Sequence, residues 1–198
     1  KNELKRYFDS DVNSTLLELF ETTGNYDKLR QERKRREQFS IEFEYVIQRT
    51  DRYGTATSLQ AVYELVGDEE QVVMTGGDDF IYRVDGNSEL KLALDSFRSS
   101  EAEHAVIGVP ISPLEAAGRY GILLVDSLGQ LRGIDEKPSI GQIDANPYAN
   151  VSRYVLSKSI WPYVEAEMLI MRRANEHSFT DVVNAAIKDG ECFNVHLA

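Results

Sequence analysis

The sequence is poor in residues that bind metals through sulfur or nitrogen. Its 198 residues contain a single cysteine, Cys192, which excludes an intrachain disulfide and a cysteine-based zinc site. The three histidines, His104, His177 and His196, lack the close spacing of a histidine metal motif. A histidine metal site would therefore have to be assembled entirely by the fold. Scarce cysteine is typical of a reducing compartment, and we expect a cytoplasmic protein.

Long apolar runs and excess basic charge are missing as well. No apolar stretch approaches the ~20 residues that span a bilayer, so we expect no membrane association. The start of the chain shows no apolar signal segment. The 22 Lys and Arg residues face 33 Asp and Glu residues, which gives a net charge of −11. Such a surface repels polyanions, so nucleic acid is not an expected partner.

The chain does contain a regular alternation of apolar strands and amphipathic helices. The run at 104–111 is continuously apolar, which is typical of a strand covered on both faces. Residues 121–138 predict two strands around a tight turn at 127–130. This alternation predicts an α/β domain with a mostly parallel central sheet between two helical layers. We expect strands at 41–48, 71–75, 104–111, 150–157 and 193–197, and helices at 58–67, 88–99, 161–174 and 179–190.

Two glycines and two aspartates follow the apolar strand at 71–75. In an α/β sheet, ligands bind beyond the carboxyl ends of strands, and Gly76 and Gly77 would let one approach the backbone closely. Mg²⁺ usually takes one or two carboxylates together with phosphate oxygens. The local sequence therefore fits a Mg²⁺-phosphate site anchored by one aspartate, and it fits a plain turn equally well.

Other short pieces also carry candidate groups. Glu136 could accept hydrogen bonds from sugar hydroxyls, and Lys137 could neutralise a phosphate. The Gln48 side chain can both donate and accept, which suits the edge of a nucleobase, and Gly54 would let a base lie against the main chain. Each piece alone is weak, because an exposed Glu-Lys pair at a strand end is common.

The order of these pieces is more specific than any one of them. YGTA, VGDE, GGDD, YGILLVD, IDEKP, RYVLSKSIWP and FTDVVNAAI follow one another through nearly the whole chain. In this order the sequence resembles the sugar-1-phosphate nucleotidyltransferases, and among them the bacterial uridylyltransferases of glucose-1-phosphate. The resemblance implies a Rossmann-like fold, Mg²⁺ as cofactor, and UTP and glucose-1-phosphate as substrates that form UDP-glucose and pyrophosphate.

The resemblance also implies roles for individual residues. Asp78 matches the catalytic metal ligand and Lys137 the lysine on the sugar phosphate, whereas Asp79 is expected to shape the loop. The implied positions are nucleotide-binding Gln48, Gly54 and Gly77, and sugar-binding Gly121, Glu136 and Ser152.

The chain departs from the family pattern in several places. The family begins with a strand and a glycine-rich nucleotide loop, and it carries a second metal-binding aspartate later; neither is present here. We therefore interpret residues 1–198 as a single, partial catalytic domain that is not active alone. Ser152 stands where the family usually has glycine, and Asn150 where it usually has an apolar residue. Family members form homodimers or homotetramers, which the resemblance implies here too.

Alternative interpretations stay open. The chain could be a degenerate, non-catalytic module that binds sugar nucleotides or regulates. It could also be a transferase of the same family with another base or sugar, such as a thymidylyltransferase. The basic run from Lys28 to Arg36 favours a solvated helix or an excursion away from the core, with a phosphate or partner patch as the alternative.

Overall fold

The structure is a computed structural model of the chain. It describes residues 14–38, 44–48, 51–78, 80–171 and 176–198. The chain divides into two compact units, Lys1–Ile47 and Gln48–Ala198, and each is described by itself. The expectation of one domain over residues 1–198 stays a prediction. No helix within the described ranges has the length and apolar character needed to cross a bilayer.

The first unit contains two helices joined by a tight turn. Helices α2 (Ser14–Thr22) and α3 (Tyr26–Gln38) meet at Gly24, whose φ of 67° is the left-handed conformation that glycine adopts without strain. Leu29 of α3 is buried, whereas its neighbours Lys28 and Arg30 are exposed. The helix predicted for the basic run is confirmed, and its exposed bases fit the interpretation as a solvated face.

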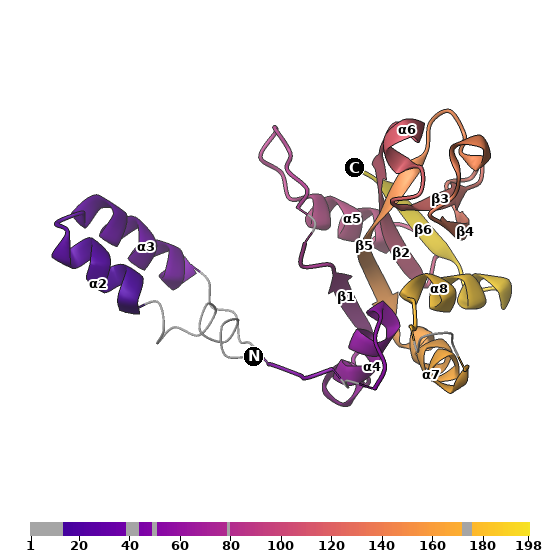
Figure 1. The fold of residues 1–198 in the computed structure, drawn as a ribbon, viewed down its shortest axis with the longest axis horizontal. Helices are drawn as coiled ribbons and strands as arrows, with labels where there is room; N and C mark the ends of the chain where they lie inside the picture. The colour runs from indigo at the N-terminus through magenta and orange to yellow at the C-terminus, as the bar shows by residue number, and fades with distance from the viewer. Residues whose placement is uncertain (1–13, 39–43, 49–50, 79, 172–175) are drawn as a thin grey trace. The chain divides into compact units, whose positions relative to one another are not determined.

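The second unit is built on a six-stranded sheet (Figure 1). The strand order is β4-β3-β5-β2-β6, and β1 pairs with the far end of β5. The long strand β5 therefore joins the two parts of the sheet. The strands are β1 (Gln71–Thr75), β2 (His104–Pro110), β3 (Gly121–Val125), β4 (Leu131–Glu136), β5 (Tyr148–Ser157) and β6 (Phe193–Leu197).

Strand direction differs from the sequence prediction. The α/β class is confirmed, but the sheet is not mostly parallel among the described strands: β2 and β6 run parallel, while β1, β2 and β3 run antiparallel to β5. The physical reason is that a continuous apolar run reports burial on both faces, and it says nothing of the direction of the neighbouring strand. The strand expected at 41–48 is also wrong where it can be seen, because residues 44–48 form no regular structure.

Helices cover both faces of the sheet, as the apolar run at 104–111 predicts. Along β2, Val106 packs into the main core with Trp161 and Val183, and the next residue, Ile107, packs on the opposite face against Ala93. The period of two along a strand separates these two cores. The main core lies under α4 (Thr55–Val66), α7 (Trp161–Leu169) and α8 (Phe179–Lys188), and the smaller one lies under α5 (Glu89–Arg98).

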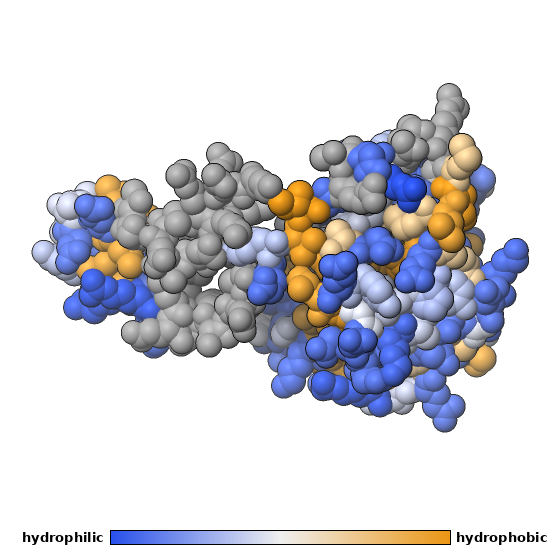
Figure 2. Space-filling view, turned by 90° about the horizontal axis from the view of Figure 1, so that it is seen from below, coloured by the Kyte–Doolittle hydropathy of each residue, from blue (hydrophilic) through white to orange (hydrophobic). Residues whose placement is uncertain are grey.

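The outer surface carries some apolar side chains among many polar ones. Figure 2 shows a mainly hydrophilic face on which hydrophobic residues gather in a few groups. Leu65 of α4, and Leu169 and Met171 at the end of α7, are exposed. Leu169 and Met171 flank Ile170, which is exposed as well, so the end of α7 carries three consecutive exposed apolar residues.

Candidate functional site

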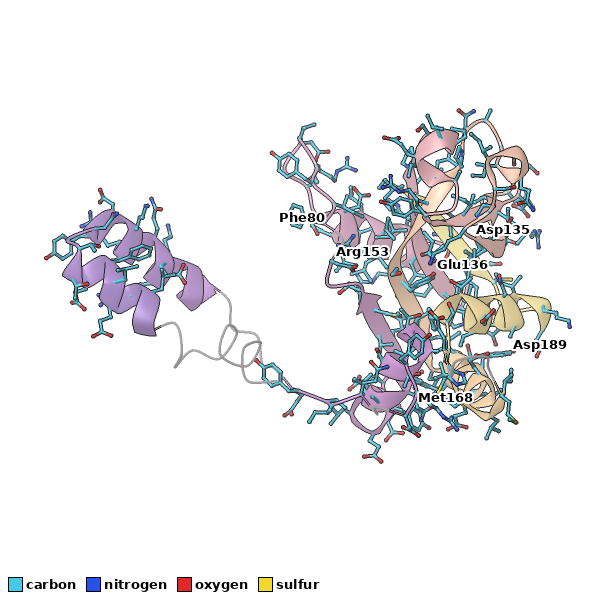
Figure 3. The ribbon with its side chains drawn as sticks, in the orientation of Figure 1. Phe80, Asp135, Glu136, Arg153, Met168 and Asp189 are labelled. Carbon is cyan, nitrogen blue, oxygen red and sulfur yellow. The ribbon has the colours of Figure 1, made fainter. Side chains whose placement is uncertain are left out.

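The end of β4 brings two predicted sugar-site residues together. Gly121 begins β3 and lies opposite Glu136 in the antiparallel ladder. A Cβ atom on Gly121 would lie 3.0 Å from Glu136 Oε2 and 3.1 Å from Ile134 Cγ2. Glycine at 121 therefore leaves room for the carboxylate of Glu136. Figure 3 shows Glu136 at the strand end, above α8.

The Glu136 carboxylate has a fixed partner on α8. The Thr180 hydroxyl donates a hydrogen bond of 3.1 Å to Glu136 Oε2. Thr180 lies in the first turn of α8, whose N-cap Ser178 accepts a hydrogen bond from Thr180 N. The amide of Asn184, one turn later, bonds both backbone polar groups of Ile134 at 2.8 and 3.0 Å. These contacts hold α8 in register with β4 and set the position of the carboxylate.

Lys137 and Ser152 both adopt the left-handed backbone conformation. Their φ angles are 50° and 51°, which are uncommon for residues other than glycine. Lys137 N donates to Tyr120 O at 3.2 Å, which continues the pairing of β3 and β4 by one residue, and the Lys137 side chain is exposed. At Ser152 the same conformation explains why glycine suits this position in the family. Such local strain is concentrated at functional sites.

Asn150 lies between Ser152 and the pair formed by Gly121 and Glu136. Its Oδ1 accepts hydrogen bonds from Ser152 N at 3.0 Å and from the Tyr154 hydroxyl at 2.9 Å. A backbone N–H can only donate, which assigns the oxygen to this side of the amide. The Cβ of Asn150 lies 3.6 Å from the position of a Cβ on Gly121. Within the described residues Asn150 Nδ2 has no hydrogen-bond partner, and the residue as a whole is half-buried.

The sequence analysis missed Thr180 and Tyr154, and it noted Asn150 only as a departure from the family. Burial raises the pKa of the Tyr154 phenol above its usual range, so this hydroxyl keeps its proton and donates to Asn150. A signal was present, because alternate residues on a strand share one face. Asn150, Ser152 and Tyr154 have this spacing on β5.

The predicted metal segment begins beside Ser152. Gly76 N donates to Ser152 O at 3.0 Å, directly after β1 ends. Gly77 is exposed, and a Cβ placed there would meet nothing within 4 Å. Asp78 is exposed as well, and Asp79 lies outside the described residues. In the described part of the chain no group of three or more His, Cys, Asp or Glu residues could hold a metal, and the role of Asp78 toward Mg²⁺ stays a prediction.

Gly54 has a structural role that the sequence analysis did not foresee. Its φ is 110°, and a Cβ there would lie 2.1 Å from the carbonyl oxygen of His177. Buried His177 donates its N–H to Tyr53 O at 2.9 Å, and its carbonyl accepts from Ala56 N at 3.1 Å. The close approach that requires glycine is thus made by the backbone of His177. The role of Gly54 toward a nucleobase stays a prediction.

The start of α8 contacts both the segment around Gly54, predicted to bind the nucleotide, and Glu136, predicted to bind the sugar. Phe179 N donates to Thr55 Oγ1 at 2.8 Å, immediately after Gly54, and the next residue, Thr180, holds Glu136. In the same half as Gly54, the Gln48 side-chain oxygen accepts from Ser58 Oγ at 3.0 Å. Two consecutive residues of α8 therefore contact Glu136 and Thr55, the residue that follows Gly54.

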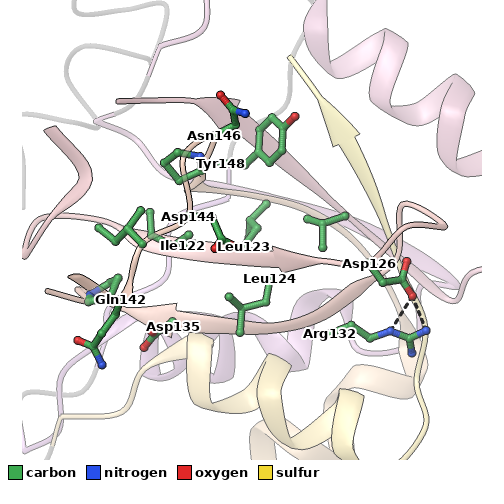
Figure 4. A pocket seen from close by; sticks show the side chains of 14 residues that line it. Ile122, Leu123, Leu124, Asp126, Arg132, Asp135, Gln142, Asp144, Asn146 and Tyr148 are labelled. Carbon is green, nitrogen blue, oxygen red and sulfur yellow. Dashed lines mark hydrogen bonds and ion pairs between the residues drawn. The ribbon is translucent and has the colours of Figure 1, made fainter. Parts of the chain in front are cut away.

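A cavity of about 390 Å³ lies on the β3–β4 hairpin and is not part of this arrangement (Figure 4). Ile122, Leu124, Asp135 and Tyr148 line it, with the Asp126–Arg132 ion pair at one end. None of the eight predicted site residues lines this cavity. The candidate site is therefore built on the strand ends and on α8.

The chain is similar in sequence and in fold to known proteins. The model of the Nucleotidyl transferase family matches residues 3–196. The low-salt glycan biosynthesis nucleotidyltransferase Agl11 of Haloferax volcanii is 24% identical over 161 residues, which are 80% of this chain and 40% of that protein. The chain thus spans less than half the length of this curated relative.

Two solved structures share the fold. The structure of apo UDP-glucose pyrophosphorylase has a TM-score of 0.68 at 20% identity, over 78% of this chain and 55% of that one. The structure of UDP-glucose pyrophosphorylase complexed with UDP-glucose has a TM-score of 0.65 at 21% identity, over 78% and 58%. These likenesses support the expected Rossmann-like fold.

Proposed function

Because the chain belongs to the Nucleotidyl transferase family, we propose that its protein transfers a uridylyl group from UTP to glucose-1-phosphate. The products are UDP-glucose and pyrophosphate. The likeness of the fold to UDP-glucose pyrophosphorylase supports the choice of substrates. The chain spans 55–58% of those two structures, so this proposal concerns the full-length protein.

The observation that carries the proposal is the polar group around Glu136. Thr180 fixes one carboxylate oxygen of Glu136, and the absent side chain of Gly121 leaves space beside it. Asn150, whose Cβ lies 3.6 Å from where a Cβ on Gly121 would be, carries an Nδ2 donor in the same region. Sugar hydroxyls both donate and accept, so an acceptor and a donor in one region suit a sugar ring.

Lys137 supplies the charge for the phosphate of the sugar. It follows Glu136 directly, its side chain is exposed, and its ammonium group is a compact point charge on a long stem. In the proposed reaction a phosphate oxygen of glucose-1-phosphate attacks the α-phosphorus of UTP. The new P–O bond forms as the bond to the β-phosphate oxygen breaks, and pyrophosphate leaves with that electron pair. The protein contributes by holding the reactants in line, so no covalent intermediate with the chain is needed.

Asp78 is the residue that would hold Mg²⁺. A single exposed carboxylate behind two glycines fits this ion, because Mg²⁺ commonly takes one or two carboxylates and completes its shell with phosphate oxygens and water. A bound Mg²⁺ would neutralise charge that develops on the phosphates.

The nucleotide is assigned to the segments around Gln48, Gly54 and Gly77. Ser58 donates to the Gln48 side-chain oxygen and so orients the amide, which keeps its own N–H groups for a base edge. Gly77 has open space above its backbone, where a phosphate could approach.

The proposal is tested by incubating the full-length protein with Mg²⁺ and a panel of nucleotides and sugar phosphates. Product sugar nucleotide is measured by chromatography and pyrophosphate by a coupled assay. UTP with glucose-1-phosphate is expected to give the highest kcat/KM. A higher value with dTTP would transfer the assignment to a thymidylyltransferase, and tight UDP-glucose binding without turnover would indicate a non-catalytic binding module.

A further inference from the structure

A buried carboxylate outside the sugar site joins three elements of the fold. Glu89, the first residue of α5, receives His196 Nε2 of β6 at 2.6 Å on Oε1 and Arg83 Nη1 at 2.8 Å on Oε2. Arg83 also makes hydrogen bonds of 2.7 and 3.1 Å with Asp85. Burial would raise the pKa of Glu89, but the hydrogen bonds from Arg83 and His196 outweigh it and lower the pKa.

This cluster holds the segment that follows Asp78. Residues 80–84 alternate: Phe80, Tyr82 and Val84 point outward, with exposures of 86%, 76% and 94%. Figure 3 shows Phe80 away from the body of the sheet. Ile81 packs against the small core under α5, and Arg83 reaches Glu89. The alternation therefore attaches the segment to the domain through Ile81 and Arg83.

Residues on either side of Asp78 make defined contacts with the rest of the domain. On one side, Gly76 N is bonded to Ser152 O at 3.0 Å. On the other side are the contacts of Ile81 and Arg83. The described residues between β1 and α5 form neither helix nor strand, so ladder hydrogen bonds do not set their path.

We propose that the cluster of Arg83, Glu89 and His196 is a positioning device that sets the place of Asp78 relative to the sugar site. This inference rests on the proposed function, because it takes Asp78 as the metal ligand. It adds three positioning residues to the site, two of which lie on α5 and β6. None of the three is expected to contact substrate.

The expected consequence is a selective loss of metal affinity. Groups that orient a metal ligand typically change metal affinity by roughly 10- to 100-fold when they are removed. Glu89→Gln keeps the shape of the side chain but removes the charge that holds Arg83 and His196. We expect the Mg²⁺ concentration for half-maximal turnover to rise roughly tenfold, with the KM for glucose-1-phosphate changed less than about twofold.

The test uses the full-length protein and two readouts. One is the Mg²⁺ dependence of UDP-glucose formation. The other needs no turnover: binding of Mn²⁺ in the presence of UDP-glucose, followed by the electron paramagnetic resonance signal of free Mn²⁺. Asp78→Asn serves as the reference for a lost ligand. Glu191→Gln is the matched control, because it also removes a carboxylate that pairs with a histidine, His104, at 3.2 Å.

The inference predicts weaker Mn²⁺ binding in Glu89→Gln than in Glu191→Gln, and a smaller loss in Arg83→Lys, which keeps the charge, than in Glu89→Gln. If Glu89→Gln fails to fold, His196→Gln removes one partner alone and takes its place. Mn²⁺ binding equal to wild type in these variants would overturn the inference, as would a wild-type protein that binds no Mn²⁺. A wild type that binds Mn²⁺ through Asp78 but makes no UDP-glucose would refute the proposed function and leave the positioning role standing.

Discussion

Replacing Gly54 with alanine is expected to destabilise the second unit strongly. Gly54 has φ 110° and ψ 168°, a region that is almost exclusive to glycine. Holding another residue there costs on the order of 1–3 kcal/mol. In addition, the new Cβ would lie 2.1 Å from the carbonyl oxygen of His177, so one of the two backbones has to move.

That movement would weaken the backbone bonds around His177. The bond from Ala56 N to His177 O is 3.1 Å long, and the bond from His177 N to Tyr53 O is 2.9 Å. Each such bond contributes roughly 1 kcal/mol to stability. Together with the conformational strain, we expect the free energy of unfolding to fall by about 2–5 kcal/mol.

Urea denaturation followed by tryptophan fluorescence measures this loss. Trp161 is the single tryptophan of the chain and is buried in the main core, so its emission reports the second unit. Gly141→Ala is the matched control, because a Cβ at Gly141 meets nothing within 4 Å, and a change within about 0.5 kcal/mol is expected there. A Gly54→Ala protein within about 1 kcal/mol of wild type would refute the reasoning.

Three further predictions follow from single contacts. Thr180→Val removes the donor to Glu136 and should raise the KM for glucose-1-phosphate roughly 5- to 10-fold, whereas Thr180→Ser should restore it in the same steady-state assay. Burial lowers the pKa of His104, although the charge of Glu191 opposes this shift. As the pH falls, the His104 ring is therefore protonated in the unfolded chain before it is protonated in the folded one. Stability should therefore fall as pH drops below about 6.5, and His104→Gln should flatten that part of the urea-denaturation profile. Leu156 is fully buried, so Leu156→Ala should cost about 2–5 kcal/mol in urea denaturation; a smaller loss would contradict its place in the core.

Local patterns predicted the parts of the site that lie close together in the sequence. The two strands within 121–138 are confirmed, and their register places Gly121 opposite Glu136. A hairpin with a short turn brings these strand ends together, but a register shift between Leu124 and Val125 moves the pairing by one residue, so the exact partner of Gly121 could not be predicted from the turn. The cap at Ser178 and the helix that follows it were predictable because a serine before an apolar periodic run is typical of a helix start.

Contacts between distant segments were not predictable in this way. Gly54 meets His177, and Glu136 meets Thr180, across long stretches of chain. No periodicity or turn signal reports which segments pack side by side, since that depends on the direction of each strand. The same limit produced the wrong expectation of a mostly parallel sheet. The order of motifs through the chain indicated the family, but it did not reveal the link from Ser152 to Gly76.

The central claim is Mg²⁺-dependent uridylyl transfer at a site that contains Asp78. The most direct measurement is the rate of UDP-glucose formation by the full-length protein and by its Asp78→Asn variant, with urea denaturation of both. Because Asp78 is exposed, the variant should unfold like wild type. We expect its turnover to fall roughly 100-fold or more. Unchanged turnover in a correctly folded Asp78→Asn protein would contradict the account.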